Sequence, residues 1–160
     1  MSRAAYASVD DLVAAARSGL ARLDPVGVCR AVADGAWMVD IRPHEQRVRE
    51  GEIPGALIIE RNHLEWRLHP TSTARLSVAA PGQRWVVFCS EGYTSSLAAE
   101  ALCSLGLDAT DLDGGFHAWQ AAGLPTVPGG TPAEQMSPFY RWTQPIGSEP
   151  LAGDNPAVSG

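Results

Sequence analysis

Short apolar runs alternate along the chain with longer stretches in which apolar residues recur every three or four positions. An unbroken short run suits a strand that is buried on both faces of a parallel sheet. The longer stretches are typical of helices with one buried face. The alternation predicts an α/β fold with a central parallel sheet of four to five strands, right-handed crossovers and helices on both faces. The strand candidates are residues 36–41, 56–59, 85–88 and 107–112, with residues 20–23 as a short edge strand.

Capping residues mark the helices that precede the first long strand. Ser8 is placed to cap a helix that ends near Gly19. Asp24 and Pro25 form an N-cap and first-turn pair for a second helix. Further along the chain, residues 62–67 predict a short helix.

The remaining connections are polar or rich in glycine. Residues 45–52 are charged, and we expect them to be solvated, while residues 70–82 form a polar connection into the next strand. Gly114 and Gly115 follow the last strand and begin a final helix. We expect this pair to permit close packing of the helix against the sheet, because a glycine pair without further spacing is weak evidence for phosphate binding.

The central stretch of the chain is WVVFCSEGYTSS, residues 85–96. Its apolar run stops at Cys89, and helical spacing begins at Ser95 and continues to Gly106. The backbone between the two patterns must curl around the sulfur. Gly92 can adopt there a φ angle that other residues resist.

This loop geometry favours a negative charge at the sulfur. A loop that closes onto a helix N-terminus directs several backbone amides to one point, and the helix dipole adds positive potential. We expect the amides of residues 90–95 to converge on Cys89 and to favour its thiolate. The alternative is that Cys89 only ends a core strand, because free cysteine is among the most buried residue types. Its place at a strand-to-helix junction favours chemistry.

Four stretches of the sequence resemble the motifs of one family. CSEGYTSS, residues 89–96, resembles the active-site loop of rhodanese-like sulfurtransferases, in which a cysteine opens a six-residue loop with glycine at its fourth position. MVDIRP at 38–43, GEIPGA at 51–56 and LDGGFHAWQAAGLP at 112–125 match the same family in order and spacing. The resemblance covers residues 10–126 and implies a rhodanese-like fold.

The resemblance also implies a sulfurtransferase. Cys89 is then the nucleophile that takes the outer sulfur of thiosulfate or a mercapto-acid, forms a persulfide and passes the sulfur to a thiol or cyanide acceptor. No metal and no organic cofactor is expected. For the hydroxyls of Thr94 and Ser95, capping of the helix is the expected role. The loop residues expected to bind substrate and persulfide are Ser90, Glu91, Gly92, Tyr93, Thr94 and Ser95.

The family's VDxR signature falls on Asp40 and Arg42. We expect the two residues to brace neighbouring loops, with substrate contact by Arg42 as the alternative. With Asp40, the glycine pair Gly114 and Gly115 is assigned to structural support. Glu52 stands where the family commonly has histidine, which removes any hydrogen bond that a histidine would make there.

Arg61 lies just past the strand candidate 56–59, at the sheet edge expected to carry Cys89. Two roles are open for it. It contacts an anionic donor, or it pairs at the surface with Glu60 or Glu65.

Two other functions compete with sulfur transfer. Cysteine phosphatases and arsenate reductases have a loop in which a cysteine is followed by five residues and then by an arginine that binds two oxygens. In this chain, the sixth residue after Cys89 is Ser95. A rhodanese fold that binds a partner without catalysis is the second alternative.

Glu91 affects which donor is expected. Its negative charge should disfavour a doubly charged anion, which predicts weak activity with thiosulfate.

Composition limits the partners and the cellular location that we expect for the protein. The chain has 160 residues, a formal net charge of −6 and no basic run, so neither nucleic acid nor a membrane is an expected partner. Its three cysteines fit neither a disulfide framework nor a paired CxxC metal site, which favours a reducing cytoplasm. Of these, Cys103 is expected to pack in the core. The histidines His44, His63, His69 and His117 show no ligand spacing, and none is assigned to a metal.

The chain divides into three parts by pattern. Residues 1–7 form an N-terminal arm, residues 8–127 the rhodanese-like domain and residues 128–160 a tail rich in proline and glycine. The tail carries an aromatic cluster at Phe139, Tyr140 and Trp142, which we expect to dock on the domain or on a second copy.

Overall fold

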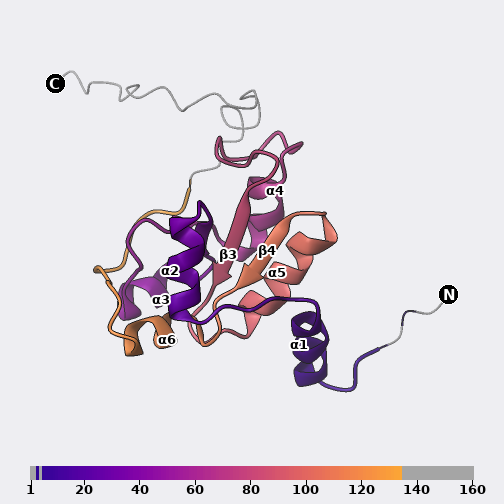
Figure 1. Cartoon of the computed structure of the whole chain (residues 1–160), viewed down its shortest axis with the longest axis horizontal. Helices are drawn as coiled ribbons and strands as arrows, with labels where there is room; N and C mark the ends of the chain where they lie inside the picture. Colours follow the sequence, from indigo (N-terminus) through magenta and orange to yellow (C-terminus); the bar gives the residue numbers. More distant parts are fainter. Residues whose placement is uncertain (1–2, 4, 135–160) are drawn as a thin grey trace.

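The computed structural model describes residue 3 and residues 5–134 of the chain. A four-stranded parallel sheet forms the centre of this part (Figure 1). The strand order β2-β1-β3-β4 places β1 and β3 at the centre. All neighbouring strands are parallel, as predicted, and Val39 of β1 lies opposite both Leu57 and Val87. The strands are β1 (Trp37–Asp40), β2 (Leu57–Ile58), β3 (Arg84–Phe88) and β4 (Asp108–Asp111).

Helices cover both faces of this sheet, which confirms the predicted architecture. Trp85 and Val87 of β3 pack towards α4 and α5, whereas Val86 and Phe88 pack towards α2 and α6. Cys89 continues the alternation and joins the α5 side. The helices are α1 (Val9–Ser18), α2 (Pro25–Ala33), α3 (His44–Glu50), α4 (Leu64–Leu68), α5 (Thr94–Ser104) and α6 (Gly115–Ala121), with a 3-10 turn η1 (Arg61–His63) before α4.

The predicted helix caps are confirmed. Ser8 Oγ accepts from the amide of Asp11 at 3.0 Å, and Asp24 Oδ1 accepts from the amide of Gly27 at 2.7 Å. After α5, Gly106 has a φ of +77°, a left-handed conformation that suits glycine.

Three predictions about connections are wrong or only partly right. Residues 20–23 form no strand, and only an isolated bridge joins Leu23 to Leu112. The connection 70–82 contributes buried apolar residues to the core, among them Leu76. Residues 45–52 are not solvated as a whole, because Arg47 is fully buried and Glu52 is only 3% exposed.

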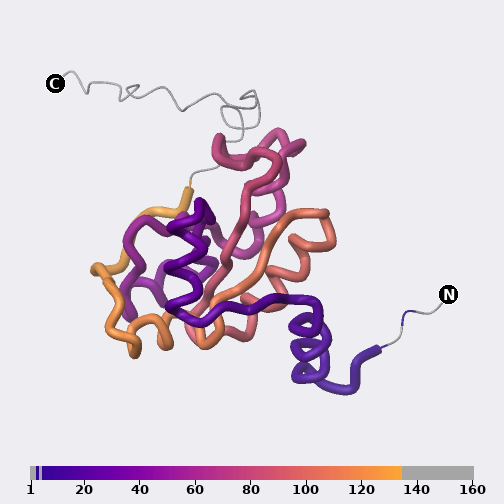
Figure 2. Tube along the Cα trace, in the orientation of Figure 1, coloured from indigo at the N-terminus to yellow at the C-terminus, as the bar shows by residue number. Residues whose placement is uncertain are grey.

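The chain after α6 returns along α3 and β2. Val127 forms an antiparallel bridge with Glu52, and the amide of Glu134 donates to the carbonyl of Ile58 at 2.8 Å. We call residues 127–134 the strap. Figure 2 shows the strap in orange to yellow beside the purple segment that contains α3. The aromatic cluster Phe139, Tyr140 and Trp142 lies outside the described residues.

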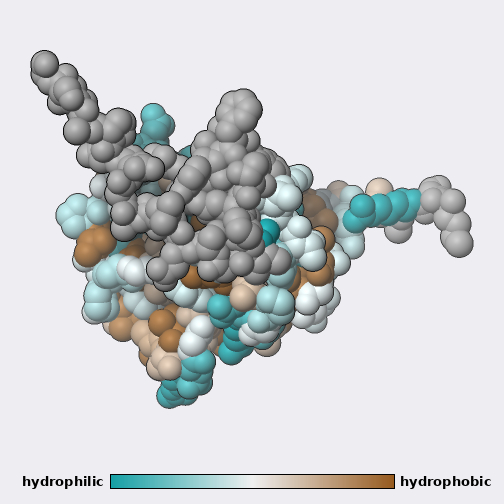
Figure 3. Space-filling view, turned by 90° about the horizontal axis from the view of Figure 1, so that it is seen from above, coloured by the Kyte–Doolittle hydropathy of each residue, from teal (hydrophilic) through white to brown (hydrophobic). Residues whose placement is uncertain are grey.

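The surface of the described domain mixes polar and apolar residues. Figure 3 shows hydrophilic and hydrophobic residues interspersed on the face seen from above. Within residues 5–134, no helix combines the length and the apolar character that a membrane span requires.

Candidate active site around Cys89

Cys89 directly follows β3, where the chain turns from strand to helix α5. Its side chain is largely buried, with 6% relative exposure. The amide of Gly92 donates to Cys89 Sγ at 3.2 Å, and in the described part of the chain it is the one backbone amide with such a bond. Gly92 has a φ of +88°, so the residue type and the turn agree. The predicted convergence of several amides is therefore seen for one of them.

Two arginines donate to the carbonyl of Gly92, and a serine hydroxyl lies close to it. Arg17 Nη2 donates to it at 2.8 Å and Arg22 Nη2 at 3.0 Å, while Ser96 Oγ lies at 3.3 Å. Because the carbonyl and the amide belong to adjacent peptide units, fixing the carbonyl also restricts the direction of the amide that faces the sulfur.

A buried aspartate at the end of β4 gathers the same side chains. Asp111 accepts from Arg22 Nε at 2.9 Å and from the hydroxyls of Ser95 and Ser96 at 2.8 Å each. Helix α5 has no side-chain cap, so the expected capping by Thr94 or Ser95 is wrong. The Ser95 hydroxyl bonds to Asp111 because that carboxylate is fully buried and needs donors. Arg17, Arg22, Ser95, Ser96, Asp111 and the Gly92 carbonyl form the Asp111 network.

The glycine pair permits close packing of α6, but against the Cys89 loop that follows β3 and not, as predicted, against the sheet itself. A Cβ atom on Gly115 would lie 2.5 Å from the carbonyl oxygen of Cys89, and one on Gly92 would lie 2.9 Å from the amide nitrogen of Gly114. The amide of Phe116 then donates to the carbonyl of Cys89 at 2.8 Å. The first turn of α6 is thereby tied to the loop.

Arg42 braces the other side of the site. Its Nη2 lies 2.7 Å from Asp40 Oδ2 and donates to the carbonyl of Gly51 at 2.8 Å. The guanidinium also lies 4.3 Å from the centre of the Phe116 ring. Burial raises the pKa of Asp40, and the hydrogen bonds and charge of Arg42 lower it in part. With Arg42 only 1% exposed, these contacts favour the bracing role over substrate contact.

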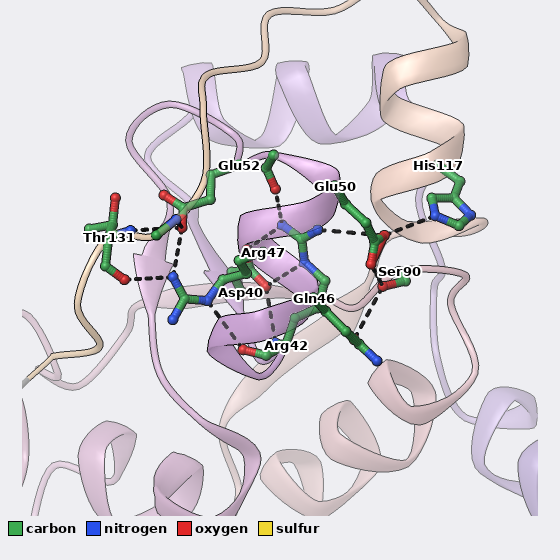
Figure 4. A network of polar contacts seen from close by, with 11 residues as sticks. Asp40, Arg42, Gln46, Arg47, Glu50, Glu52, Ser90, His117 and Thr131 are labelled. Carbon is green, nitrogen blue, oxygen red and sulfur yellow. Dashed lines mark hydrogen bonds and ion pairs between the residues drawn. The ribbon is translucent and has the colours of Figure 1, made fainter.

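Glu50, at the end of α3, links Ser90 to His117 (Figure 4). Ser90 Oγ donates to Glu50 Oε1 at 2.7 Å, and Glu50 Oε2 lies 2.9 Å from His117 Nε2. Arg42 Nη1 lies 3.8 Å from the same carboxylate. The carboxylate is therefore fixed from three sides.

Glu52 forms a buried ion pair with Arg47, whose Nη1 lies 2.6 Å from Glu52 Oε2 (Figure 4). The amides of Gly130 and Thr131 in the strap donate to the same oxygen at 3.0 and 3.1 Å. Burial alone would raise the pKa of Glu52, but the hydrogen bonds from Thr131, Arg47 and Gly130 outweigh it and lower the pKa. We call the joined contacts of Asp40, Arg42, Gln46, Arg47, Glu50, Glu52, Ser90, His117 and Thr131 the α3 network.

Two cavities are lined in part by Cys89, a residue that keeps 6% of its surface exposed. Gln46, Cys89 and Thr94 border both of them. The first, of about 500 Å³, we call the His117 cavity, and its further lining residues are Arg49, Glu50, Ser90, Glu91, Tyr93 and His117. The second, of about 570 Å³, we call the Arg61 cavity, and its further lining residues are Ile41, Arg42, Pro43, Glu60, Arg61 and Asn62.

Both roles considered for Arg61 are compatible with its position. Its Nη1 lies 2.7 Å from Glu65 Oε1, so the surface pair exists. The same side chain lines the cavity that Cys89 borders. A third cavity, of about 870 Å³, lies between α1, α4 and α5 and does not include Cys89.

The wall of the His117 cavity contains four residues that the sequence did not indicate as site residues: Gln46, Arg49, Glu50 and His117. Three of them come from α3, in a segment expected to be solvated, and His117 stands in a helix chosen for its apolar face. No local signal marks them, because they reach the cysteine only through the fold. His44 is exposed and lines neither cavity at Cys89.

Cys103 differs from Cys89 in its surroundings. Its Sγ lies 3.2 Å from the carbonyl oxygen of Ala109, and the residue packs against the core, as expected. Burial raises the pKa of the Cys103 thiol, and the charges of Glu100 and Asp108 add to this. Among the described residues, no group of three or more His, Cys, Asp or Glu side chains is placed to hold a metal ion.

Comparison with known proteins bears on the fold and on the site. A family model described as a rhodanese-like domain matches residues 28–122, more than half of the chain. The structure is similar to a Rhodopseudomonas palustris protein of unknown function, described as a possible tyrosine phosphatase, with 28% identity, a TM-score of 0.69, and 79% of this chain and 98% of that chain covered.

A thiosulfate sulfurtransferase from Pseudomonas aeruginosa is also similar, at 28% identity and a TM-score of 0.55, over 69% of this chain and 20% of that much longer one. The fold is shared with a rhodanese-related protein from Thermoplasma volcanium, at 22% identity and a TM-score of 0.54. That similarity covers 66% of this chain and 96% of the other chain. No curated protein matches the sequence.

Proposed function

The chain belongs to the rhodanese-like domain family, and we propose that it is a sulfurtransferase that works through a persulfide on Cys89. One observation carries this proposal. Cys89 lines two cavities, its sulfur accepts a hydrogen bond from the Gly92 amide, and it adjoins the N-terminus of an eleven-residue helix. We infer that a small donor reaches the sulfur from these cavities, where the amide and the helix dipole favour the negative charge that develops during transfer.

The loading step needs no group beyond those present. The Cys89 thiolate attacks the outer sulfur of thiosulfate, the sulfur–sulfur bond of the donor breaks, and sulfite leaves with the electron pair. Negative charge moves from Sγ to the new terminal sulfur. The Gly92 amide and the α5 dipole favour that charge, in the way an oxyanion hole favours a developing oxygen charge.

Intact mass spectrometry tests the proposal. Incubation with thiosulfate or 3-mercaptopyruvate is expected to add one sulfur atom to the protein, and cyanide is expected to remove it. Cys89→Ser should gain nothing, while Cys103→Ser, the matched control, should load as the wild type does. An unmodified mass with every donor would favour a domain that binds without catalysis.

A phosphatase is the second candidate, because the Rhodopseudomonas palustris protein is described as a possible tyrosine phosphatase. The loop argues for sulfur transfer instead. The sixth residue after Cys89 is Ser95, whose hydroxyl bonds to Asp111, so the loop offers no arginine to clamp two phosphate oxygens. Hydrolysis of p-nitrophenyl phosphate that depends on Cys89 would reverse this preference.

A further inference from the structure

His117 and Glu50 form a pair that the loading step does not use. Both side chains line the His117 cavity with Cys89. The His117 side chain is 52% exposed, and its Nε2 lies 2.9 Å from Glu50 Oε2. A carboxylate only accepts, so in the neutral imidazole the proton is on Nε2 and Nδ1 keeps its lone pair. Among the described residues, Nδ1 has no hydrogen-bond partner.

The surroundings hold the pair in place. Glu50 is fixed by Ser90, which directly follows the nucleophile, and by the charge of Arg42. The amide of His117 donates to the carbonyl of Ser90 at 3.0 Å, so the histidine backbone is tied to the same loop. A carboxylate that orients an imidazole in this way is the arrangement that makes histidine an effective general base.

With thiosulfate as the donor, sulfur transfer has one step that requires such a base. A thiosulfate donor brings no proton to remove, but a thiol acceptor does, since only a few per cent of an ordinary thiol is ionised near pH 7. We propose that His117, oriented by Glu50, takes the proton from an acceptor thiol bound in the His117 cavity. This inference rests on the proposed function and assigns the cavity to the acceptor.

The step balances without a further reactant. His117 Nδ1 takes the thiol proton, and the new thiolate attacks the terminal sulfur of the Cys89 persulfide. The bond between that sulfur and Sγ breaks, and its electron pair returns to Cys89 as thiolate. The product leaves as a persulfide of the acceptor, and the imidazolium then gives its proton to water.

The charges that face His117 favour a small neutral thiol. Glu50 and Arg49 of α3 and Glu91 of the loop line the same cavity, and Arg42 stands behind Glu50. The two carboxylates disfavour an acceptor with several negative charges. We therefore choose 2-mercaptoethanol as the probe.

A single-turnover experiment tests the role of His117. The protein is loaded with sulfur, freed of donor and mixed with 2-mercaptoethanol or with sulfite, which attacks through a lone pair without first losing a proton at mildly alkaline pH. Loss of the added sulfur is followed by rapid quench and intact mass. For His117→Gln, the ratio of the thiol rate to the sulfite rate is expected to fall about tenfold.

The controls separate the two proposals. His44→Gln makes the same chemical change at an exposed position outside both cavities and should keep the wild-type ratio. An unchanged ratio in His117→Gln, or an equal fall with both acceptors, would overturn the role of His117. Failure of the wild-type protein to load overturns the proposed function itself, at a stage of the experiment where His117 plays no part.

Discussion

Two polar networks meet at the Cys89 loop from opposite sides and are built differently. The Asp111 network ends on the Gly92 carbonyl, and its buried carboxylate is matched by the guanidinium of Arg22 and two hydroxyls. The α3 network ends on the side chains of Ser90 and His117. Within it, Arg42 Nη1 and Arg47 Nη2 are buried without a hydrogen-bond partner in the described part of the chain.

This difference indicates a division of work. A network that holds backbone sets where the sulfur lies and which amide faces it. A network that holds side chains sets the wall of a cavity and leaves the His117 side chain open to solvent. We therefore expect transfer of sulfur to Cys89 to depend on Asp111. Transfer of sulfur from Cys89 to the acceptor should depend on the α3 network.

Asp111→Asn should have the largest effect. The change removes the charge that Arg22 faces and weakens the hold on the Gly92 carbonyl. Breaking a buried ion pair of this kind should lower the free energy of unfolding by about 3 kcal/mol. Urea denaturation measures that loss, and intact mass should show slower loading of Cys89 in the fraction that remains folded.

Asp113→Asn is the matched control for this prediction. Asp113 also pairs with Arg22, at 3.0 Å, but its side chain is 64% exposed. An exposed pair contributes less than about 1 kcal/mol, so stability and loading should hardly change. Equal losses in the two variants would contradict the central place of Asp111.

The elements that surround Cys89 could be predicted from local sequence. The end of β3 at Phe88, the cap at Ser8 and the turn at Gly92 each depend on the residue itself and a few neighbours. Such signals are present in the chain before it folds. They also led to the Cys89 loop and to its resemblance to a known family.

The two networks could not be predicted, because their partners are far apart in the sequence. Arg22 and Asp111 are separated by 89 positions, and Glu52 and Thr131 by 79. Residues 45–52 were expected to be solvated because charged side chains usually face water. Arg47 is buried instead, since Glu52 and the strap supply its acceptors.

Glu52→Gln tests the α3 side and should have a smaller effect than Asp111→Asn. The variant keeps the shape of the side chain but loses the charge facing Arg47, which should cost about 2 kcal/mol near neutral pH. The lowered pKa of Glu52 gives stability that is present above the ordinary glutamate value of about 4.3 and is lost as the pH falls through the lower folded value.

The measurement is therefore urea denaturation of wild type and Glu52→Gln at several pH values. The difference between them should shrink as the pH falls below about 4. Glu45→Gln, an exposed change on the same helix, should show no such difference. Cys89 loading should be retained in Glu52→Gln, and its loss would break the proposed division between the networks.

The smallest expected effect concerns Glu91, which lines the His117 cavity beside Cys89 and is exposed. Its carboxylate repels a doubly charged donor, so Glu91→Arg should speed loading by thiosulfate about tenfold at low salt. Glu91→Gln, which only removes the charge, should give part of that gain. Loading by 3-mercaptopyruvate, which carries a single negative charge, should gain less, and added salt should reduce the gain with thiosulfate because exposed charges are screened. Rates that do not change, or that rise equally for both donors, would show that the charge of Glu91 does not select the donor.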